Sequence, residues 1–145
     1  MIRVALLPGD GVGEEVLDGP SRLLRALAAQ GLLEVTGPWP VGARAMAATG
    51  SVLPAETLAA CDDADALLLG AVGEDPRVPP GVCPRPEVAL HQLRSRYDLR
   101  ISVREVPVDE HSDLTVVRNL IGGSYGGPED RELDAAAGWP RTCCG

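Results

Sequence analysis

The chain opens with an apolar run that ends in a glycine-rich turn. Residues 2–7 are mostly β-branched or aliphatic and are followed by Pro8-Gly9-Asp10-Gly11-Val12-Gly13, which predicts a buried strand and a tight turn. Apolar side chains then recur at helical spacing over residues 14–30, with acids in the first turn, so this range predicts a helix. We expect Gly19-Pro20 to kink or divide that helix, because proline lacks an amide donor and clashes with the preceding turn.

Strand-like and helix-like segments continue to alternate beyond this helix. Residues 33–36 predict a strand, and residues 54–60 predict a helix with Pro54 near its first position. Residues 66–70 are wholly apolar, which is typical of a strand covered on both faces. The remaining expected elements are a Gly- and Pro-rich loop at 73–86, a helix at 86–97 and strands at 99–103 and 114–117. This alternation predicts an α/β fold with a mainly parallel or mixed sheet and flanking helices.

Charge narrows the possible functions. The 145 residues carry a formal net charge of −8, which offers no basic surface for a phosphate backbone and argues against a nucleic-acid partner. All 13 basic residues are arginines. The chain therefore cannot supply a lysine Schiff base, a lysine general base or a Walker-type lysine.

The cysteines and histidines do not predict a metal site. None of the four cysteines forms a C-x-x-C pair, and neither histidine lies near paired cysteines. The first residues lack the basic region and cleavage site of a signal peptide, and no apolar stretch reaches the roughly 20 residues that a membrane span needs. We expect a cytoplasmic protein with no membrane partner.

The turn Gly9-Asp10-Gly11-Val12-Gly13 has two interpretations. Its glycines suggest a dinucleotide-binding turn, but that fingerprint requires glycine or alanine one position later, where this chain has Glu14. The alternative is a tight strand-to-helix turn without a ligand.

A second group of residues has the chemistry to bind carboxylates. Glu87, Leu90 and Arg94 are spaced i, i+3 and i+7, so they project from one face of the predicted helix. Arg104 and Arg118 each lie at the end of a predicted strand. The three guanidinium groups could converge on a small polycarboxylate, because arginine forms planar bidentate pairs with carboxylates; ordinary surface salt bridges are the alternative.

Tyr125 lies within a glycine-rich segment, residues 122–127. Glycines there would let a ligand approach the backbone closely, and the phenol could donate a proton. An ordinary glycine-rich turn is the alternative.

Four motifs occur in the order found in one known family. They are L-P-G-D-G-V-G-E-E-V at 7–16, A-D-A-L-L-L-G-A-V-G at 64–73, R-P-E followed by L-R at 85–94, and V-R-N-L-I-G-G-S-Y-G-G at 117–127. Together they resemble the β-decarboxylating dehydrogenases of the isocitrate/isopropylmalate dehydrogenase family, from residue 2 to about residue 130, and the R-P-E motif favours the isopropylmalate branch. Dinucleotide binding in this family does not use the Rossmann fingerprint, in agreement with Glu14.

The resemblance implies an oxidoreductase of leucine biosynthesis that depends on NAD and on Mg²⁺ or Mn²⁺. It would oxidise a 2-hydroxy polycarboxylate such as 3-isopropylmalate to a keto acid and release the β-carboxylate, and it would work as a homodimer. Arg94, Arg104 and Arg118 would bind the malate part of the substrate, and Tyr125 would protonate the enol left by decarboxylation. The stretch from Gly73 to Glu87 would lie beside the nicotinamide half of NAD, with Glu87 and Leu90 bordering the variable substituent.

The resemblance also implies a division of the chain. Residues 1–99 would be the amino-terminal part of a first, cofactor-side domain, and residues 100–134 would begin a second domain for substrate binding and dimerisation. Residues 135–145 lack periodicity and form an atypical tail. In a GC-rich gene, codons for Val-Ala-Ala-Asp-Thr read one base later give Trp-Pro-Arg-Thr, so this tail is hypothesised to be out of frame.

Several positions depart from the family pattern. His91 replaces an apolar residue, Glu105 follows Arg104 in place of proline, Asn119 replaces an acid, and the connection from Arg104 to Arg118 is short. The family's catalytic lysine and metal-binding aspartates would lie beyond Tyr125, so we expect a truncated site that does not turn over alone. The alternatives are a non-catalytic relic or interaction subunit, and a small carboxylate- or nucleotide-binding module.

Overall fold

The computed structural model describes residues 1–79, 85–109 and 112–120. It divides into two compact units, one from Met1 to Leu90 and one that begins at His91. The boundary between the units falls within a helix. The expected domain limits at residues 99 and 134 stay predictions.

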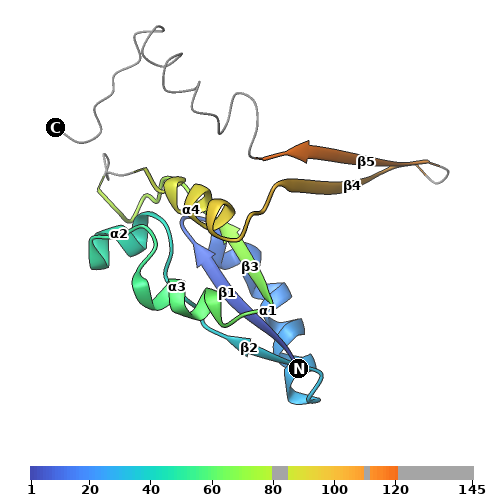
Figure 1. Ribbon diagram of the computed structural model, residues 1–145, viewed down its shortest axis with the longest axis horizontal. Helices are drawn as coiled ribbons and strands as arrows, with labels where there is room; N and C mark the ends of the chain where they lie inside the picture. Colours follow the sequence, from blue (N-terminus) through green and yellow to red (C-terminus); the bar gives the residue numbers. More distant parts are fainter. Residues whose placement is uncertain (80–84, 110–111, 121–145) are drawn as a thin grey trace, which may run out of the picture. The chain divides into compact units, whose positions relative to one another are not determined.

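The first unit is built around a three-stranded parallel sheet. Its elements are β1 Ile2–Gly9, α1 Gly13–Ala29, β2 Leu33–Thr36, α2 Ala43–Thr49, α3 Ala55–Asp62, β3 Ala66–Ala71 and the start of α4 Val88–Arg96 (Figure 1). The strand order is β2-β1-β3, so the chain moves to one side of β1 and then crosses to the other. Right-handed crossovers of this kind place α1 on one face of the sheet and α2 and α3 on the opposite face.

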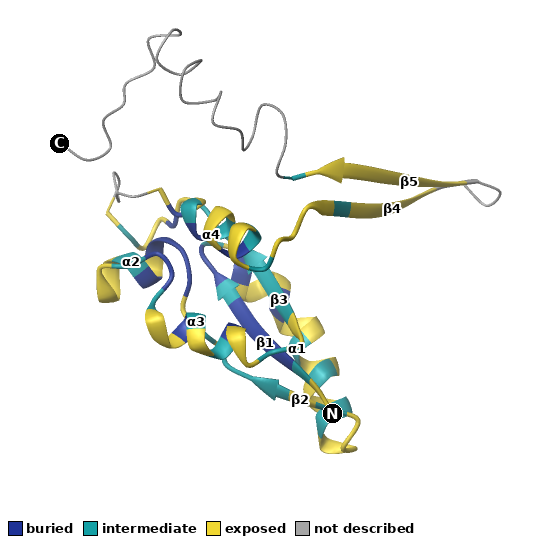
Figure 2. Cartoon of the chain, viewed as in Figure 1, coloured by how far each residue is buried: buried dark blue, intermediate teal, exposed yellow. Residues whose placement is uncertain are grey.

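The central strand β1 lies in the core of the first unit. Residues Val4, Ala5, Leu6 and Leu7 are all buried, so both faces of β1 are covered there, as Figure 2 shows by the dark blue in the middle of this strand. A strand covered on both faces needs apolar side chains at consecutive positions. The apolar run that predicted a buried first strand is therefore confirmed.

The glycine-rich turn after β1 packs directly against β3. A Cβ atom on Gly70 would lie 2.4 Å from the carbonyl oxygen of Pro8, and one on Gly13 would lie 2.0 Å from the same oxygen. These distances are shorter than any ordinary carbon–oxygen contact, so both positions need glycine. The glycines of this turn serve the close approach of two strands and the first turn of α1.

The described part of the second unit contains an antiparallel pair of strands, β4 Ile101–Asp109 and β5 Ser112–Asn119. Both faces of this pair are solvent-exposed, and Figure 2 shows it almost entirely in yellow. Its exposed large apolar residues are Ile101, Val103, Val106, Leu114, Val116 and Val117.

The predicted α/β class, with a parallel sheet and flanking helices, is confirmed. Two local expectations differ from the structure. The division of the first helix at Gly19-Pro20 is wrong: α1 runs unbroken through Pro20, and its contacts with all three strands of the sheet stabilise both halves. The helix α2 was not expected, because its seven residues are too few to show helical periodicity.

Replacing Gly70 by alanine is expected to destabilise the protein by about 1–3 kcal/mol, because the new methyl group would overlap the Pro8 carbonyl. The matched control is Gly19→Ala, since no atom lies within 4 Å of a Cβ at Gly19. There the gain in helix propensity is opposed by the following Pro20, so the change should stay within about 1 kcal/mol. Urea denaturation followed by circular dichroism measures both; equal midpoints for the two variants would contradict the packing argument.

Candidate functional site

A buried carboxylate joins three segments at the carboxyl ends of the strands. Asp10 is only 2% exposed. Its oxygens accept hydrogen bonds from the backbone amides of Ala43 at 2.9 Å, Arg44 at 3.0 Å and Gly73 at 3.2 Å. The carboxylate therefore caps the amino terminus of α2 and fixes the loop that follows β3.

A second buried carboxylate, Asp75, organises the neighbouring loop. Its side chain is 0% exposed and accepts a hydrogen bond from the Gly11 amide at 3.0 Å. The Arg77 side chain donates to both of its oxygens, from Nε at 2.9 Å and from Nη2 at 2.8 Å. The Arg77 guanidinium, together with the amides of Arg77 and Gly11, holds the pKa of the Asp75 carboxyl well below its usual range.

The backbone amides of the glycine-rich turn are used within the protein. The Asp10 amide donates to the Ala71 carbonyl at 2.7 Å, and the Gly13 amide donates to the Asp10 carbonyl at 2.8 Å. The Gly11 amide donates to Asp75. These three donors cannot also bind a phosphate, so the structure gives the physical reason why the turn departs from the Rossmann pattern.

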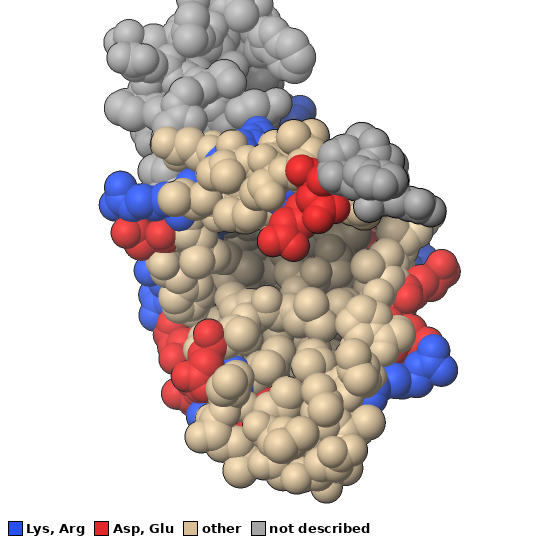
Figure 3. Space-filling view, turned by 90° about the vertical axis from the view of Figure 1, so that its right-hand side faces the viewer, with Lys and Arg blue, Asp and Glu red and all other residues tan. Residues whose placement is uncertain are grey.

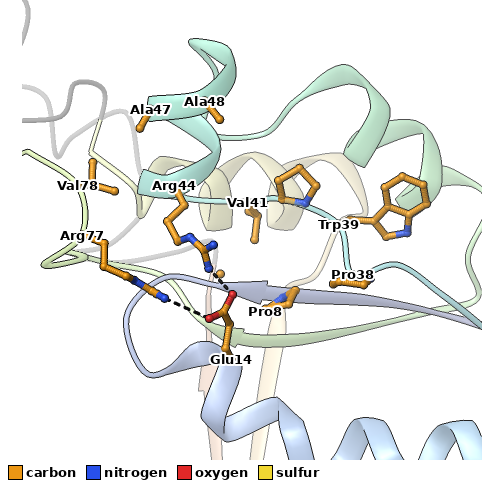
Figure 4. A pocket seen from close by; sticks show the side chains of 12 residues that line it. Pro8, Glu14, Pro38, Trp39, Val41, Arg44, Ala47, Ala48, Arg77 and Val78 are labelled. Atoms are coloured by element: carbon orange, nitrogen blue, oxygen red, sulfur yellow. Dashed lines mark hydrogen bonds and ion pairs between the residues drawn. The ribbon is translucent and has the colours of Figure 1, made fainter.

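Glu14, the residue that breaks that pattern, bridges two arginines. Its Oε1 pairs with Nη1 of Arg44 from α2, and its Oε2 lies 3.1 Å from Nη1 of Arg77 (Figure 4). Hydrogen bonds from Arg44 and then Arg77 lower the pKa of the Glu14 carboxyl. Because the Glu14 side chain is 48% exposed, solvent screens these ion pairs.

The bridged arginines border an open cavity of about 530 Å³. Figure 4 shows Glu14 with Arg44 and Arg77 at its edge, and apolar side chains on its other sides. The remaining lining residues are Pro8, Gly9, Pro38, Trp39, Pro40, Val41, Ala47, Ala48 and Val78. The cavity thus combines an uncharged wall with one cluster of charged groups.

Other arginines make ordinary surface ion pairs. Arg3 pairs with Glu34 at 3.0 Å, Arg22 with Asp18 at 2.9 Å and Arg100 with Asp98 at 2.7 Å. On the face shown in Figure 3, basic and acidic side chains likewise adjoin at several places. Pairs as exposed as these contribute little to stability.

Two residues expected at the cofactor site lie together. The carboxylate of Glu87 is 3.9 Å from the position that a Cβ atom on Gly73 would take. Glu87 is exposed and Leu90, also expected to border the substrate, is half-buried. Because Gly73 is fixed by Asp10, the Glu87 carboxylate faces a rigid stretch of backbone. Contact with NAD or substrate stays a prediction for these three residues.

The strand pair places two of the three predicted substrate-binding arginines on one face. Ser102 is opposite Arg118 and Arg104 is opposite Val116, so Arg104 and Arg118 are diagonal neighbours. Cβ atoms in this relation lie roughly 7–8 Å apart, within reach of long side chains. Arg94 is half-buried in the last turn of α4. Tyr125, the predicted proton donor, lies outside the described residues.

The described residues do not gather into a metal site. Among residues 1–79, 85–109 and 112–120, no three His, Cys, Asp or Glu side chains lie close enough together to hold a metal ion.

Cys61 is buried, and burial raises the pKa of its thiol. In the described part of the chain, no helix has the length and apolar character required to cross a membrane.

The network around Glu14 was missed in the sequence. Asp10, Asp75, Arg44 and Arg77 attracted no functional assignment, because their partners are far away along the chain. The available signal was the position of Asp10, an acid between two glycines directly after a strand predicted to be buried. Such an acid requires donors from elsewhere in the fold.

The fold is similar to that of a β-decarboxylating dehydrogenase. The crystal structure of a β-decarboxylating dehydrogenase from Thermococcus kodakarensis, in its apo form, is similar with a TM-score of 0.63 and 31% sequence identity. That similarity covers 82% of this chain and 34% of the Thermococcus chain.

The chain belongs to the isocitrate/isopropylmalate dehydrogenase family, whose family model matches residues 3–139. Two similar relatives are named 3-isopropylmalate dehydrogenase. One, from Synechococcus sp. (strain CC9902), is 39% identical over 92% of this chain, and one from Symbiobacterium thermophilum is 40% identical over 86% of it. The chain spans 42% and 38% of the lengths of these two relatives.

Replacing Asp10 by asparagine is expected to lower the free energy of unfolding by about 1–3 kcal/mol, because the new amide group leaves at least one buried backbone donor unpaired. The control is Asp18→Asn, which removes an exposed carboxylate that pairs with Arg22 on the same helix; a change of about 0.5 kcal/mol or less is expected. Urea denaturation of both variants tests this, and an Asp10 variant as stable as the control would refute the capping role.

The depressed pKa of Asp75 predicts an acid-dependent loss of stability. The folded-state pKa lies below the ordinary value of 3.8, so the ion pair stabilises the protein fully above that value. This contribution is lost as the pH falls through about 4 towards the folded-state pKa. Urea midpoints measured between about pH 6 and pH 2.5 should therefore fall less steeply for Asp75→Asn than for the parent. The exposed Glu56→Gln variant should follow the parent; parallel curves for all three proteins would disprove the assignment.

Proposed function

We propose that this chain provides the cofactor-side turn and part of the carboxylate-binding residues of a dehydrogenase that oxidises a 2-hydroxy acid such as 3-isopropylmalate. Family membership supports the reaction class. The name shared by the two relatives supports 3-isopropylmalate as the substrate. The observation that carries the proposal is the register of β4 and β5, which puts Arg104 and Arg118 on one face.

In this proposal the arginines bind and orient the substrate. Arg104 and Arg118 donate hydrogen bonds to the carboxylates of the malate part, and Arg94 completes the group. Arginine suits this task because its planar fork of donors matches a carboxylate. Glu87 and Leu90 border the variable substituent, and Tyr125 returns a proton to the enol after decarboxylation.

The residues near β3 fit a dinucleotide better than they fit a metal. The exposed carboxylate of Glu87 beside the rigid backbone of Gly73 offers an acceptor for ribose hydroxyls. NAD, when bound, would take the hydride from the hydroxyl-bearing carbon. Within the described residues the donor set does not fit Mg²⁺ or Mn²⁺, so the proposal assigns no metal ligand to them.

The proposal also covers the location, the pathway and the oligomeric state of the enzyme. We propose a cytoplasmic enzyme of leucine biosynthesis that acts as a homodimer. The exposed apolar residues on both faces of the β4–β5 pair support association with further polypeptide, because apolar surface of this kind is normally buried.

Calorimetric titration of the chain with 3-isopropylmalate should detect binding, and Arg104→Gln and Arg118→Gln should each weaken it by about tenfold or more, because each removes hydrogen bonds between charged groups. The control is Arg22→Gln, which removes a cation of α1 that pairs with Asp18. Its affinity should equal that of the parent.

The same titrations separate the proposed function from its alternatives. In the presence of NAD and Mg²⁺ no NADH should form, because the chain contains no lysine to act as the general base. Binding without turnover supports a carboxylate-binding role for this chain. Equal affinities of the parent, Arg104→Gln and Arg118→Gln for 3-isopropylmalate would exclude this arginine pair as the substrate site. Formation of NADH would contradict the expectation that the chain is inactive.

A further inference from the structure

The cavity beside Glu14 has the composition of a ligand site. Its walls come from the end of β1, the start of α1, the loop after β2, α2 and the loop after β3. Pro38, Trp39 and Val41 provide apolar surface, and the charged groups are confined to Glu14, Arg44 and Arg77. Binding sites of this kind combine an apolar body with a few fixed polar groups that set the orientation of the ligand.

The Arg77 side chain and the backbone of Arg44 are held in place without Glu14. Nε and Nη2 of Arg77 are fixed by the buried Asp75 carboxylate at 2.9 and 2.8 Å, which leaves Nη1 directed at Glu14. Arg44 stands in the first turn of α2, whose amides are fixed by Asp10. A site whose donors are already oriented loses less entropy when it binds an anion.

Glu14 shows that this pair of arginines accepts a carboxylate. Each of its oxygens pairs with a different guanidinium, and an external carboxylate could take the same two contacts. The Glu14 side chain is 48% exposed and lies in the first turn of α1, so it can turn to solvent without moving the backbone. The two guanidinium groups then again contact one monoanion, while the Glu14 carboxylate stays ionised in solvent.

We propose that this cavity binds a small monocarboxylate with an apolar body, whose carboxylate replaces that of Glu14 between Arg44 and Arg77. The hydrocarbon part packs against Pro38, Trp39 and Val41. The uncharged walls offer no partner for a second carboxylate. The residues of this site belong to the first unit, whereas Arg104 and Arg118 belong to the second, and the site takes a different class of ligand.

Fluorescence of Trp39 reports directly on the cavity. The indole is oriented by a hydrogen bond from Nε1 to the Thr36 hydroxyl at 3.1 Å, and it lines the cavity. The chain has two tryptophans, so Trp139→Phe makes Trp39 the sole reporter. Titration with 4-methylpentanoate should change the emission saturably, whereas acetate, which lacks the body, and 4-methylpentanamide, which lacks the charge, should bind at least about tenfold more weakly.

Two substitutions test the exchange with Glu14. Glu14→Gln removes the competing anion and should raise the affinity for 4-methylpentanoate several-fold, whereas Arg44→Gln should lower it about tenfold or more. Arg44 is preferred to Arg77, because loss of Arg77 would leave Asp75 buried without its cation. Arg22→Gln serves as the control. Thermal melting of each variant verifies that it is folded.

This test can fail or succeed independently of the test of Arg104 and Arg118 in β4 and β5. Arg104→Gln should leave 4-methylpentanoate binding unchanged. The proposal is overturned if Glu14→Gln does not raise the affinity, if the amide binds as well as the acid, or if NAD or 3-isopropylmalate displaces 4-methylpentanoate.

Discussion

The buried carboxylate of Asp10 is the interaction on which the arrangement of the first unit depends. Its oxygens accept amides from Ala43, Arg44 and Gly73, so the turn after β1, the start of α2 and the loop after β3 share one fixed point. A buried carboxylate is stable only when such donors surround it. The position of the Arg44 backbone, at the start of α2, follows from it.

Elements with strong local patterns could be predicted from the sequence. The consecutive apolar residues of β1 and β3 and the amphipathic spacing of α1 gave the right type and nearly the right bounds. The prediction failed where contacts with residues distant in sequence determine the secondary structure. The helix α2 has only seven residues and is capped by Asp10 from another segment. The helix α1 continues through Pro20 because it packs along the sheet. Helix propensity reflects only neighbouring residues, whereas tertiary contacts stabilise these two helices.

The candidate site, like the fold, could be predicted from the sequence only in part. Motif order alone led to the family, and the spacing of helix and strand residues led to Glu87, Arg94, Arg104 and Arg118. Whether two arginines share a face depends on strand register, which single-sequence patterns do not give. The bridge from Glu14 to Arg77 joins residues 63 positions apart, and no periodicity connects them.

The large sequence separation between these carboxylates and their partners also affects how the chain folds during its synthesis. The turn at residues 9–13 is complete only when Asp75 has accepted the Gly11 amide and Gly73 has donated to Asp10. During synthesis from the amino terminus, β1, α1 and β2 emerge well before these partners exist. The ribosome must therefore extend the chain past Asp75 before the first strand can acquire its native surroundings, and until then its apolar run lacks the cover that β3 and the following loop provide.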